Sequence, residues 1–297
     1  MDISFVIAER NKYAVYYSVY ESSNNFADFD WNEMLGCIDD RNCLFVLHNE
    51  KIIGGFTLTN NELCYVFAVP PFSDRKLLWK HILKYASDNC TENKIVLKFI
   101  SEEDKEILSN VFNAKVICTN RRMFRPTDKI SVNPPDGFYF TVPDANDKKE
   151  IIQAVYEAHA AGYTSTVWKP DKNEIQSAIN RRFVSFTQTN TLYMSTLAKH
   201  CENNEIAGVC IAGIYPDSAN KFSTIHQVSV RPQFRRRGIA EAMMLNSIDK
   251  ANSVSPVITL GVMVGNPAEL LYNKIGFLGG PKSSELNYNI IGEITYD

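Results

Sequence analysis

One strand–loop–helix segment in the C-terminal third constrains the fold of this chain more than any other. Residues 222–230 alternate as a strand, a turn follows, and residues 241–250 have the pattern of a helix. The connecting run Arg235–Ala240 combines three arginines with Gly238. A loop of this kind directs backbone N–H groups and the positive end of a helix dipole toward a ligand, and its glycine permits close approach. The segment therefore predicts an anion cradle, and a pyrophosphate is the expected ligand.

This loop resembles the acetyl-CoA-binding motif Gln/Arg-x-x-Gly-x-Gly/Ala of the GCN5-related N-acetyltransferase (GNAT) superfamily. Arg235, Gly238 and Ala240 occupy its three specified positions. Basic loops that contain glycine are common, so the surrounding order carries the resemblance. In that family a Val-x-Val strand end precedes the loop, and a second strand, an Asn and a helix with a Tyr before Gly-Phe follow it. This chain has the same elements in the same order, at Val228 and Val230, 257–264, Asn266, Tyr272 and Gly276-Phe277.

The resemblance implies that acetyl-CoA is the cosubstrate. Its pantetheine arm carries two amides, which can pair with an exposed strand edge as a short added strand would. Asn266 has an alternative role as a helix cap, because Pro267 and Glu269 follow it in a capping pattern. The residues expected to bind the cosubstrate are Val228, Val230, Arg235, Arg236, Arg237, Gly238, Ile239, Ala240 and Asn266.

Tyr272 is the candidate general acid. In many members of the family that the chain resembles, a Tyr at this position protonates the thiolate that leaves from CoA. A phenol with a pKa of about 10 is suited to donate to a thiolate of somewhat lower pKa. The alternative is that Tyr272 is a half-buried residue that only packs in its helix.

His226 is the candidate general base, since an ammonium cannot attack a thioester. It lies four residues before Val230, so strict alternation places both side chains on the same face of the strand. Arylalkylamine N-acetyltransferases, in the same superfamily, have a His at the corresponding place. An imidazole with a pKa of about 6.5 can accept the proton directly or through water. The alternative is a structural histidine with a satisfied hydrogen bond.

The first half of the chain reads as a degenerate copy of the second. In this superposition Phe67–Val69 falls on Val228–Val230, but the loop that follows contains two prolines and Asp74 and lacks glycine. Prolines remove N–H donors and an acid repels a phosphate, so the first copy is expected to have lost CoA binding. The expected fold class is α/β (α+β), with two GNAT-like domains that are each a mixed, mostly antiparallel sheet flanked by helices. The expected boundaries are 1–126 for the degenerate domain, 127–137 for a linker and 138–297 for the catalytic domain.

Two helical runs, 148–160 and 171–182, precede the strands of the second copy. In the superfamily such helices and their connection usually form the wall of the acceptor pocket. Tyr163 and Trp168 in the connection have the chemistry to hold an apolar or cationic acceptor, or else they pack between the two domains.

Composition favours a soluble, cytoplasmic enzyme. The net charge is −3 over 297 residues, which gives no electrostatic signature of nucleic-acid binding. Seven scattered cysteines without a Cys-x-x-Cys pair indicate reduced thiols and no metal site. Neither a signal peptide nor a membrane span is expected.

The expected function is acetyl-CoA-dependent N-acetyl transfer to a small-molecule amine by direct transfer. The alternatives are a protein or peptide N-acetyltransferase and a non-catalytic regulatory module that binds acyl-CoA. The sequence leaves the identity of the acceptor and the oligomeric state open.

Overall fold

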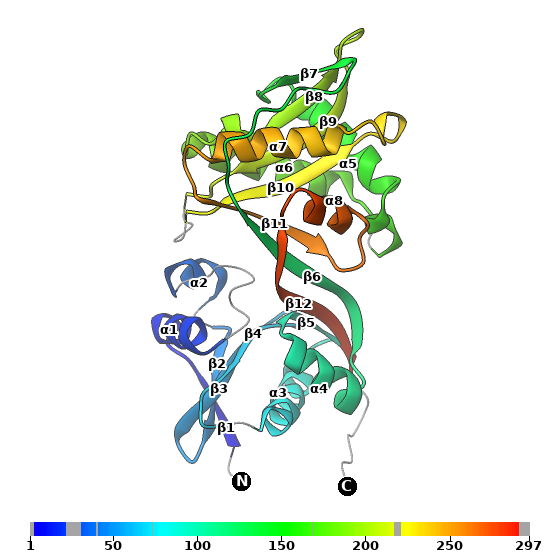
Figure 1. Cartoon of the computed structure of the whole chain (residues 1–297). Coiled ribbons are helices and arrows are strands. Elements are labelled where there is room, and N and C mark those ends of the chain that lie inside the picture. The colour runs from blue at the N-terminus through cyan, green and yellow to red at the C-terminus, as the bar shows by residue number, and fades with distance from the viewer. Residues whose placement is uncertain are drawn as a thin grey trace. The chain divides into compact units, whose positions relative to one another are not determined.

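The chain divides into two compact units, each described here by itself (Figure 1). The computed structural model describes residues 3–21, 31–39, 41–72, 74–167, 169–216 and 221–290. The first unit consists of Met1–Asn120 with Pro281–Asp297, and the second of Arg121–Gly280. The sequence-based boundaries at 126 and 138 remain predictions about domains; the units differ from them by grouping residues 281–297 with the first half of the chain.

The sheet of the first unit has the strand order β1-β2-β3-β4-β5-β12-β6. Strands β4 and β5 are parallel, whereas the pairs β1–β2, β2–β3, β3–β4 and β5–β12 are antiparallel. The elements are β1 (Ile3–Ile7), α1 (Arg10–Tyr20), α2 (Trp31–Cys37), β2 (Cys43–His48), β3 (Lys51–Thr59), β4 (Glu62–Ala68), α3 (Arg75–Asn89), β5 (Lys94–Ile100), α4 (Glu102–Phe112), the start of β6 (Lys115–Pro126) and most of β12 (Leu278–Asn289).

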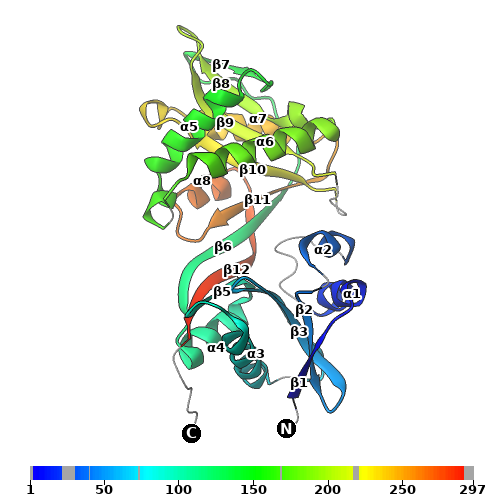
Figure 2. The ribbon, with the colours of Figure 1, turned by 180° about the vertical axis from the view of Figure 1, so that it is seen from behind.

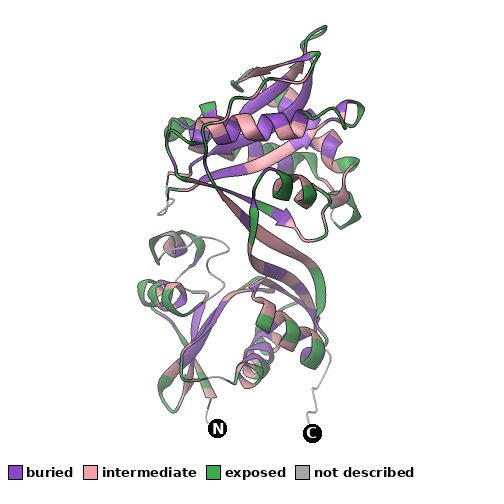
Figure 3. Ribbon diagram, in the orientation of Figure 1, coloured by how far each residue is buried: buried purple, intermediate pink, exposed green. Residues whose placement is uncertain are grey.

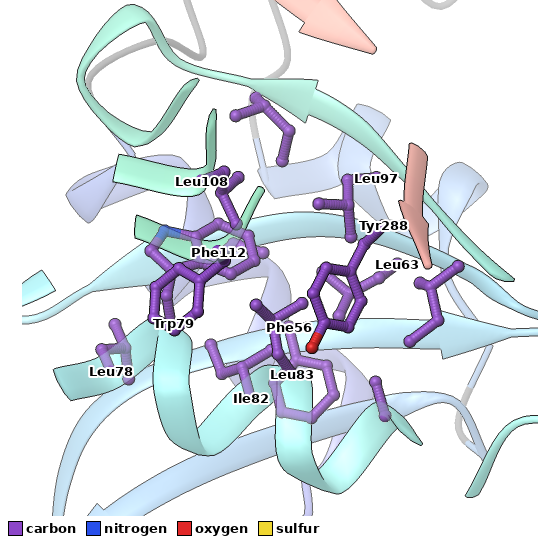
Figure 4. Close-up of a cluster of buried hydrophobic side chains, with 14 of the residues drawn as sticks. Phe56, Leu63, Leu78, Trp79, Ile82, Leu83, Leu97, Leu108, Phe112 and Tyr288 are labelled. Carbon is purple, nitrogen blue, oxygen red and sulfur yellow. The ribbon is translucent and has the colours of Figure 1, made fainter. Parts of the chain in front are cut away.

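Strand alternation separates two hydrophobic clusters in the first unit. In β2, Leu44 and Val46 belong to the cluster beneath α3 and α4, whereas Cys43 and Phe45 belong to the cluster beneath α1 and α2. The cluster beneath α3 and α4 includes Tyr288 of β12, packed among side chains of α3, α4 and the sheet (Figure 4). The core of this unit therefore depends on a strand from the far end of the sequence.

The second unit has the strand order β12-β6-β11-β10-β9-β8-β7. Helices α5 and α6 cover one face of this sheet, and α7 and α8 lie on the other (Figures 1 and 2). The elements are the end of β6, β7 (Phe138–Thr141), α5 (Lys148–Ala160), α6 (Lys172–Gln188), β8 (Thr196–His200), β9 (Ile206–Gly213), β10 (Ser223–Val230), α7 (Ile239–Ala251), β11 (Val257–Met263), α8 (Ala268–Lys274) and the start of β12.

Strand β9 is buried along its whole length, and buried residues fill the centre of this sheet (Figure 3). Val209 and Ile211 pack in the cluster beneath α5 and α6, whereas Cys210 and Ala212 pack in the cluster beneath α7. The expected fold class, a mixed and mostly antiparallel sheet flanked by helices in each of two domains, is confirmed.

A β-bulge occurs at the same place in both copies. Strand β10 has one residue more than β9 between Ile225 and Gln227, and β4 has one residue more than β3 between Cys64 and Phe67. Both bulges lie a few residues before the loop that leads to the next helix. This shared irregularity supports the internal duplication.

Strand β12 was not predicted from the sequence. Residues 192–194 before β8 form a 3-10 turn, in which the N–H of Met194 donates to the carbonyl of Thr191. Strand β6 extends over Lys115–Pro126. Strand β12 begins Leu-Gly-Gly-Pro, a composition typical of loops.

Candidate functional site

The loop between β10 and α7 has the backbone conformation of an anion-binding nest. Arg236 and Gly238 have φ of 64° and 75°, on either side of Arg237. Positive φ at alternate residues turns successive N–H groups toward one side of the chain. A Cβ at Gly238 would meet no atom within 4 Å. The glycine is therefore required by its backbone conformation, and space is open around it.

The N-terminus of α7 is left without a side-chain cap. Gly238 is the N-cap, and no side chain in the described part of the chain accepts a hydrogen bond from the first turn. In α6, by contrast, the Asp171 carboxylate accepts from the N–H groups of Asn173 and Glu174. Uncapped N–H groups at the start of a 13-residue helix attract an anion.

The arginines of the loop have different roles. The Arg235 guanidinium donates to the carbonyls of Ala158 and Ala161 at the end of α5, both at 2.8 Å, and to the carbonyl of Val230 at 3.2 Å. Arg235 therefore attaches the loop to α5, and its side chain is not directed toward an anion. Arg236 and Arg237 are exposed. They supply the cationic side chains that the loop presents to solvent.

Strand β10 has a free edge where it approaches this loop. It pairs with β11 only at Ser223–Ile225, although β10 continues to Val230 and β11 to Met263. Along its other edge β10 remains paired with β9 as far as Val230. The side chains of Val228 and Val230 pack in the cluster beneath α7. The two strands thus separate beside the loop, which leaves backbone groups of β10 near Val228 and Val230 without a β11 partner.

The bulge in β10 reverses the expected orientation of His226. Ile225 pairs with Ala212, and Gln227 pairs with Ile211. Ala212 and Ile211 are adjacent residues of β9, so their side chains point to opposite faces of the sheet. Ile225 and Gln227 therefore also face opposite sides, although they are two residues apart on β10. The His226 ring lies 5.5 Å from the Phe186 ring of α6 and 4.8 Å from that of Tyr215. His226 is on the face covered by α5 and α6, and the prediction that it shares a face with Val230 was wrong.

His226 is neutral at physiological pH. Its Nε2 atom is buried and has no hydrogen-bond partner among the residues that the structure describes. Burial lowers the pKa of His226 well below the ordinary value of 6.5, and the positive charges of Arg182 and Arg122 lower it further. An imidazole in this state is able to accept a proton, but it is a weak base.

We expect the lowered pKa of His226 to set the pH dependence of the reaction if this residue is the base. The neutral form is the active one, so kcat/KM should not change through this ionisation above pH 6.5 and should fall only at lower pH. His226→Gln should lower the rate and remove the acid limb, whereas His81→Gln in the first unit should leave the profile unchanged. Profiles from about pH 5 to 9 with amines of different pKa would test this. A limb that follows the pKa of the amine and survives His226→Gln would assign His226 to structure.

Tyr272 of α8 lies in the cluster beneath α7, and its ring is 6.4 Å from that of Phe277. Burial, and then the proximity of Cys210, raises the pKa of Tyr272 to about 12. Tyr272 is therefore fully protonated at neutral pH. It belongs to the face of the sheet opposite to His226, so the candidate acid and base lie on either side of β10.

The start of α8 shows the capping role that was the alternative for Asn266. The Asn266 Oδ1 atom accepts from the N–H of Ala268 at 3.0 Å. The preceding residue, Gly265, has φ of 88°, and its Cβ position lies 3.0 Å from the hydroxyl of Tyr163. The connection after α5 therefore reaches the loop before α8. Trp168, the other aromatic residue expected in this wall, lies outside the described residues.

Sequence reasoning missed Gln227, Arg182 and Tyr215, which lie on the face of the sheet covered by α5 and α6. The Gln227 side chain bonds to Nε2 of His159 at 3.0 Å and to the Ser229 hydroxyl at 2.8 Å. Arg182 of α6 lies close to Tyr215, whose ring packs beside that of His226. A polar Gln inside a strand was visible in the sequence, but its direction depends on the bulge.

A nest, an uncapped helix N-terminus and an open strand edge follow one another in the chain, and together they are suited to a ligand that carries both an anionic group and amides. Residues 152–277 match the model of the acetyltransferase (GNAT) family. The matched residues lie within the second unit and include the loop that carries the resemblance. The match supports acyl-CoA-dependent N-acetyl transfer in general. No curated protein matches the chain significantly.

Solved structures share the fold over the whole chain. A GCN5-related N-acetyltransferase from Sphaerobacter thermophilus is 16% identical with a TM-score of 0.71, covering 99% of this chain and 98% of its own. A tandem GNAT protein from the clavulanic acid biosynthesis pathway is 10% identical with a TM-score of 0.65, and the match covers 98% of this chain and 100% of that protein's chain. A GNAT-family acetyltransferase from Colwellia psychrerythraea is 11% identical with a TM-score of 0.57, and the match covers 97% of this chain and 100% of that protein's chain.

The described residues offer neither a metal-binding group nor a membrane-spanning helix. Within the described ranges, no group of three or more His, Cys, Asp or Glu residues is placed to hold a metal ion. Among the helices that the structure describes, none combines the length and the apolar composition needed to cross a bilayer.

Proposed function

We propose that the second unit transfers the acetyl group of acetyl-CoA directly to a small-molecule amine. The observation that carries this proposal is the free edge of β10 beside the uncapped N-terminus of α7. The edge offers backbone groups to the amides of the pantetheine arm, and the nest at Arg236–Gly238 offers N–H groups to the pyrophosphate. Ile239 and Ala240 contribute the first N–H groups of the helix.

The reaction would proceed with both substrates bound. The lone pair of the amine attacks the thioester carbonyl, the carbon–sulfur bond of the tetrahedral intermediate breaks, and the amine loses a proton to His226 or to water. A backbone N–H near Val228 would stabilise the oxyanion. The hydroxyl of Tyr272 would donate to the departing sulfur and regain its proton from solvent.

The geometry of the first unit favours a single CoA site in the chain. Asp74 caps α3 by accepting from the N–H of Leu77 at 2.8 Å, where the second unit leaves its helix open. Where β4 and β5 cease to pair, Tyr65 and Phe99 stack across the two strands with ring centroids 5.0 Å apart. An acidic cap and an aromatic stack take the places that a phosphate and a pantetheine arm would need.

Release of CoA thiol with a panel of amines tests the proposal. Amine-dependent thiol release, with the acetylated amine identified by mass, is the expected result. Transfer only to peptides would favour a peptide N-acetyltransferase. Tight binding of acetyl-CoA without thiol release for any amine or peptide would favour a regulatory module.

We predict that Tyr272→Phe lowers kcat by about one to three orders of magnitude with little change in acetyl-CoA affinity. The phenol's pKa of about 12 exceeds that of a thiol, about 8.5, so a hydrogen bond should stabilise the sulfur before the proton moves. The high pKa also predicts no alkaline loss of activity from this residue below about pH 11. Single-turnover rates and calorimetric affinities would test both points, with Tyr193→Phe, an exposed tyrosine of the same unit, as the control. An equal loss of acetyl-CoA binding would assign Tyr272 to structure.

A further inference from the structure

A polar cluster lies on the α5/α6 face of β10, next to the bulge. It consists of five side chains from α5, α6, β10 and the segment after β9: His159, Arg182, Tyr215, His226 and Gln227. Its members are linked by contact, since Gln227 bonds to His159 and Tyr215 touches both His226 and Arg182. Hydrophobic side chains of α5 and α6 surround it, among them Phe186.

One cation of the cluster, Arg182, has no carboxylate partner among the described residues. It is partly buried, and none of their ion pairs includes it. Arg231 of the same unit shows the usual arrangement, because its buried guanidinium lies within 4 Å of Glu150, Glu157 and Glu205. Burial lowers the pKa of Arg182 and of His159. A guanidinium withdrawn from water without a counter-ion is costly, and an arriving anion relieves that cost.

We propose that this cluster binds an anionic group of the acceptor, so that the acceptor is an amine that also carries a carboxylate or a phosphate. The proposal rests on the proposed acetyl transfer and specifies its substrate class. A guanidinium binds either anion through two parallel N–H donors, and Arg182 lies close to Tyr215 in the cluster. The bulge brings the cluster beside the free edge of β10, where the thioester is expected. An amine separated from its anion by a few bonds would span the two positions.

The test compares paired acceptors that differ only in the anion. α-Amino acids are assayed against their carboxamides, and phosphoethanolamine against ethanolamine, so the two arms separate carboxylate from phosphate. The variants are Arg182→Gln, Arg182→Lys and, as a matched control, Arg181→Gln, whose arginine is the exposed neighbour on α6. Calorimetric binding of the same amines in the presence of CoA, which cannot react, gives a readout independent of turnover.

We expect kcat/KM to be about 10- to 100-fold higher for the anionic member of at least one pair, as for a charge-assisted hydrogen bond. Arg182→Gln should remove this preference, Arg182→Lys should retain part of it, and Arg181→Gln should leave it intact. Equal use of anionic and neutral amines, or a preference that survives Arg182→Gln, would overturn the proposal. Anion binding that requires Arg182 without any turnover would support the anion site while rejecting acetyl transfer. Turnover of amines without a preference for the anionic member would support acetyl transfer while rejecting the anion site.

Discussion

Replacing Gly238 by glutamate should abolish acetyl-CoA binding, with an affinity loss of at least about 100-fold, or about 2.7 kcal/mol. Gly238 has φ of 75°, a conformation that costs an L-residue about 1–2 kcal/mol. The new carboxylate would also stand at the uncapped start of α7, where we expect the pyrophosphate, and the two negative charges would repel each other. Isothermal titration of the wild-type chain should give one site, and the variant should give none.

Gly137 offers a matched control for the backbone strain of this substitution. It also belongs to the second unit, has φ of 82° and has no atom within 4 Å of a Cβ position. Gly137→Glu should therefore cost similar conformational energy and leave acetyl-CoA binding intact. Unchanged binding in Gly238→Glu, or two equivalent sites in the wild type, would contradict the assignment of the loop.

A fragment that ends at residue 126 should fail to fold, although the sequence suggests a domain boundary there. The fragment lacks β12, whose residues Leu286 and Tyr288 are 0% and 3% exposed in the core beneath α3 and α4. Burial of such side chains is worth about 1.5–3 kcal/mol each, and loss of β12 also leaves the edge of β5 unpaired. Circular dichroism should show a largely unfolded chain, and residues 281–290 joined to the fragment through a flexible linker should restore cooperative unfolding.

The full chain allows the same test at one side chain. Leu286→Ala should destabilise the first unit by about 2–5 kcal/mol, whereas Asn289→Ala, at an exposed position of the same strand, should change stability little. Denaturant unfolding would measure both. Cooperative folding of the 1–126 fragment alone would show that the first unit does not need β12.

The loop could be predicted because its signal is local. A Gly with positive φ, a run of arginines and the start of a helix are determined by residues that are neighbours in the chain, and α7 begins at Ile239 directly after that glycine. The cap of α6 at Asp171 is local in the same way, since its carboxylate accepts from the N–H groups of Asn173 and Glu174. The side-chain role of Arg235 was not predicted, because its partners belong to α5, more than seventy residues away.

The sequence by itself determined the strand–loop–helix segment at the start of α7 and its resemblance to the GNAT family, because both depend on hydrophobic periodicity and on turn chemistry within short segments. Only the tertiary structure decided which face His226 occupies, since a single bulged residue reverses the alternation and its presence depends on the register with β9. Only the tertiary structure decided the position of β12 between β5 and β6. The partner of a strand is chosen among edges that are distant in sequence, and the choice depends on the hydrophobic core that each pairing would bury. Residues 278–289 contain no local signal that identifies the strands between which they pair.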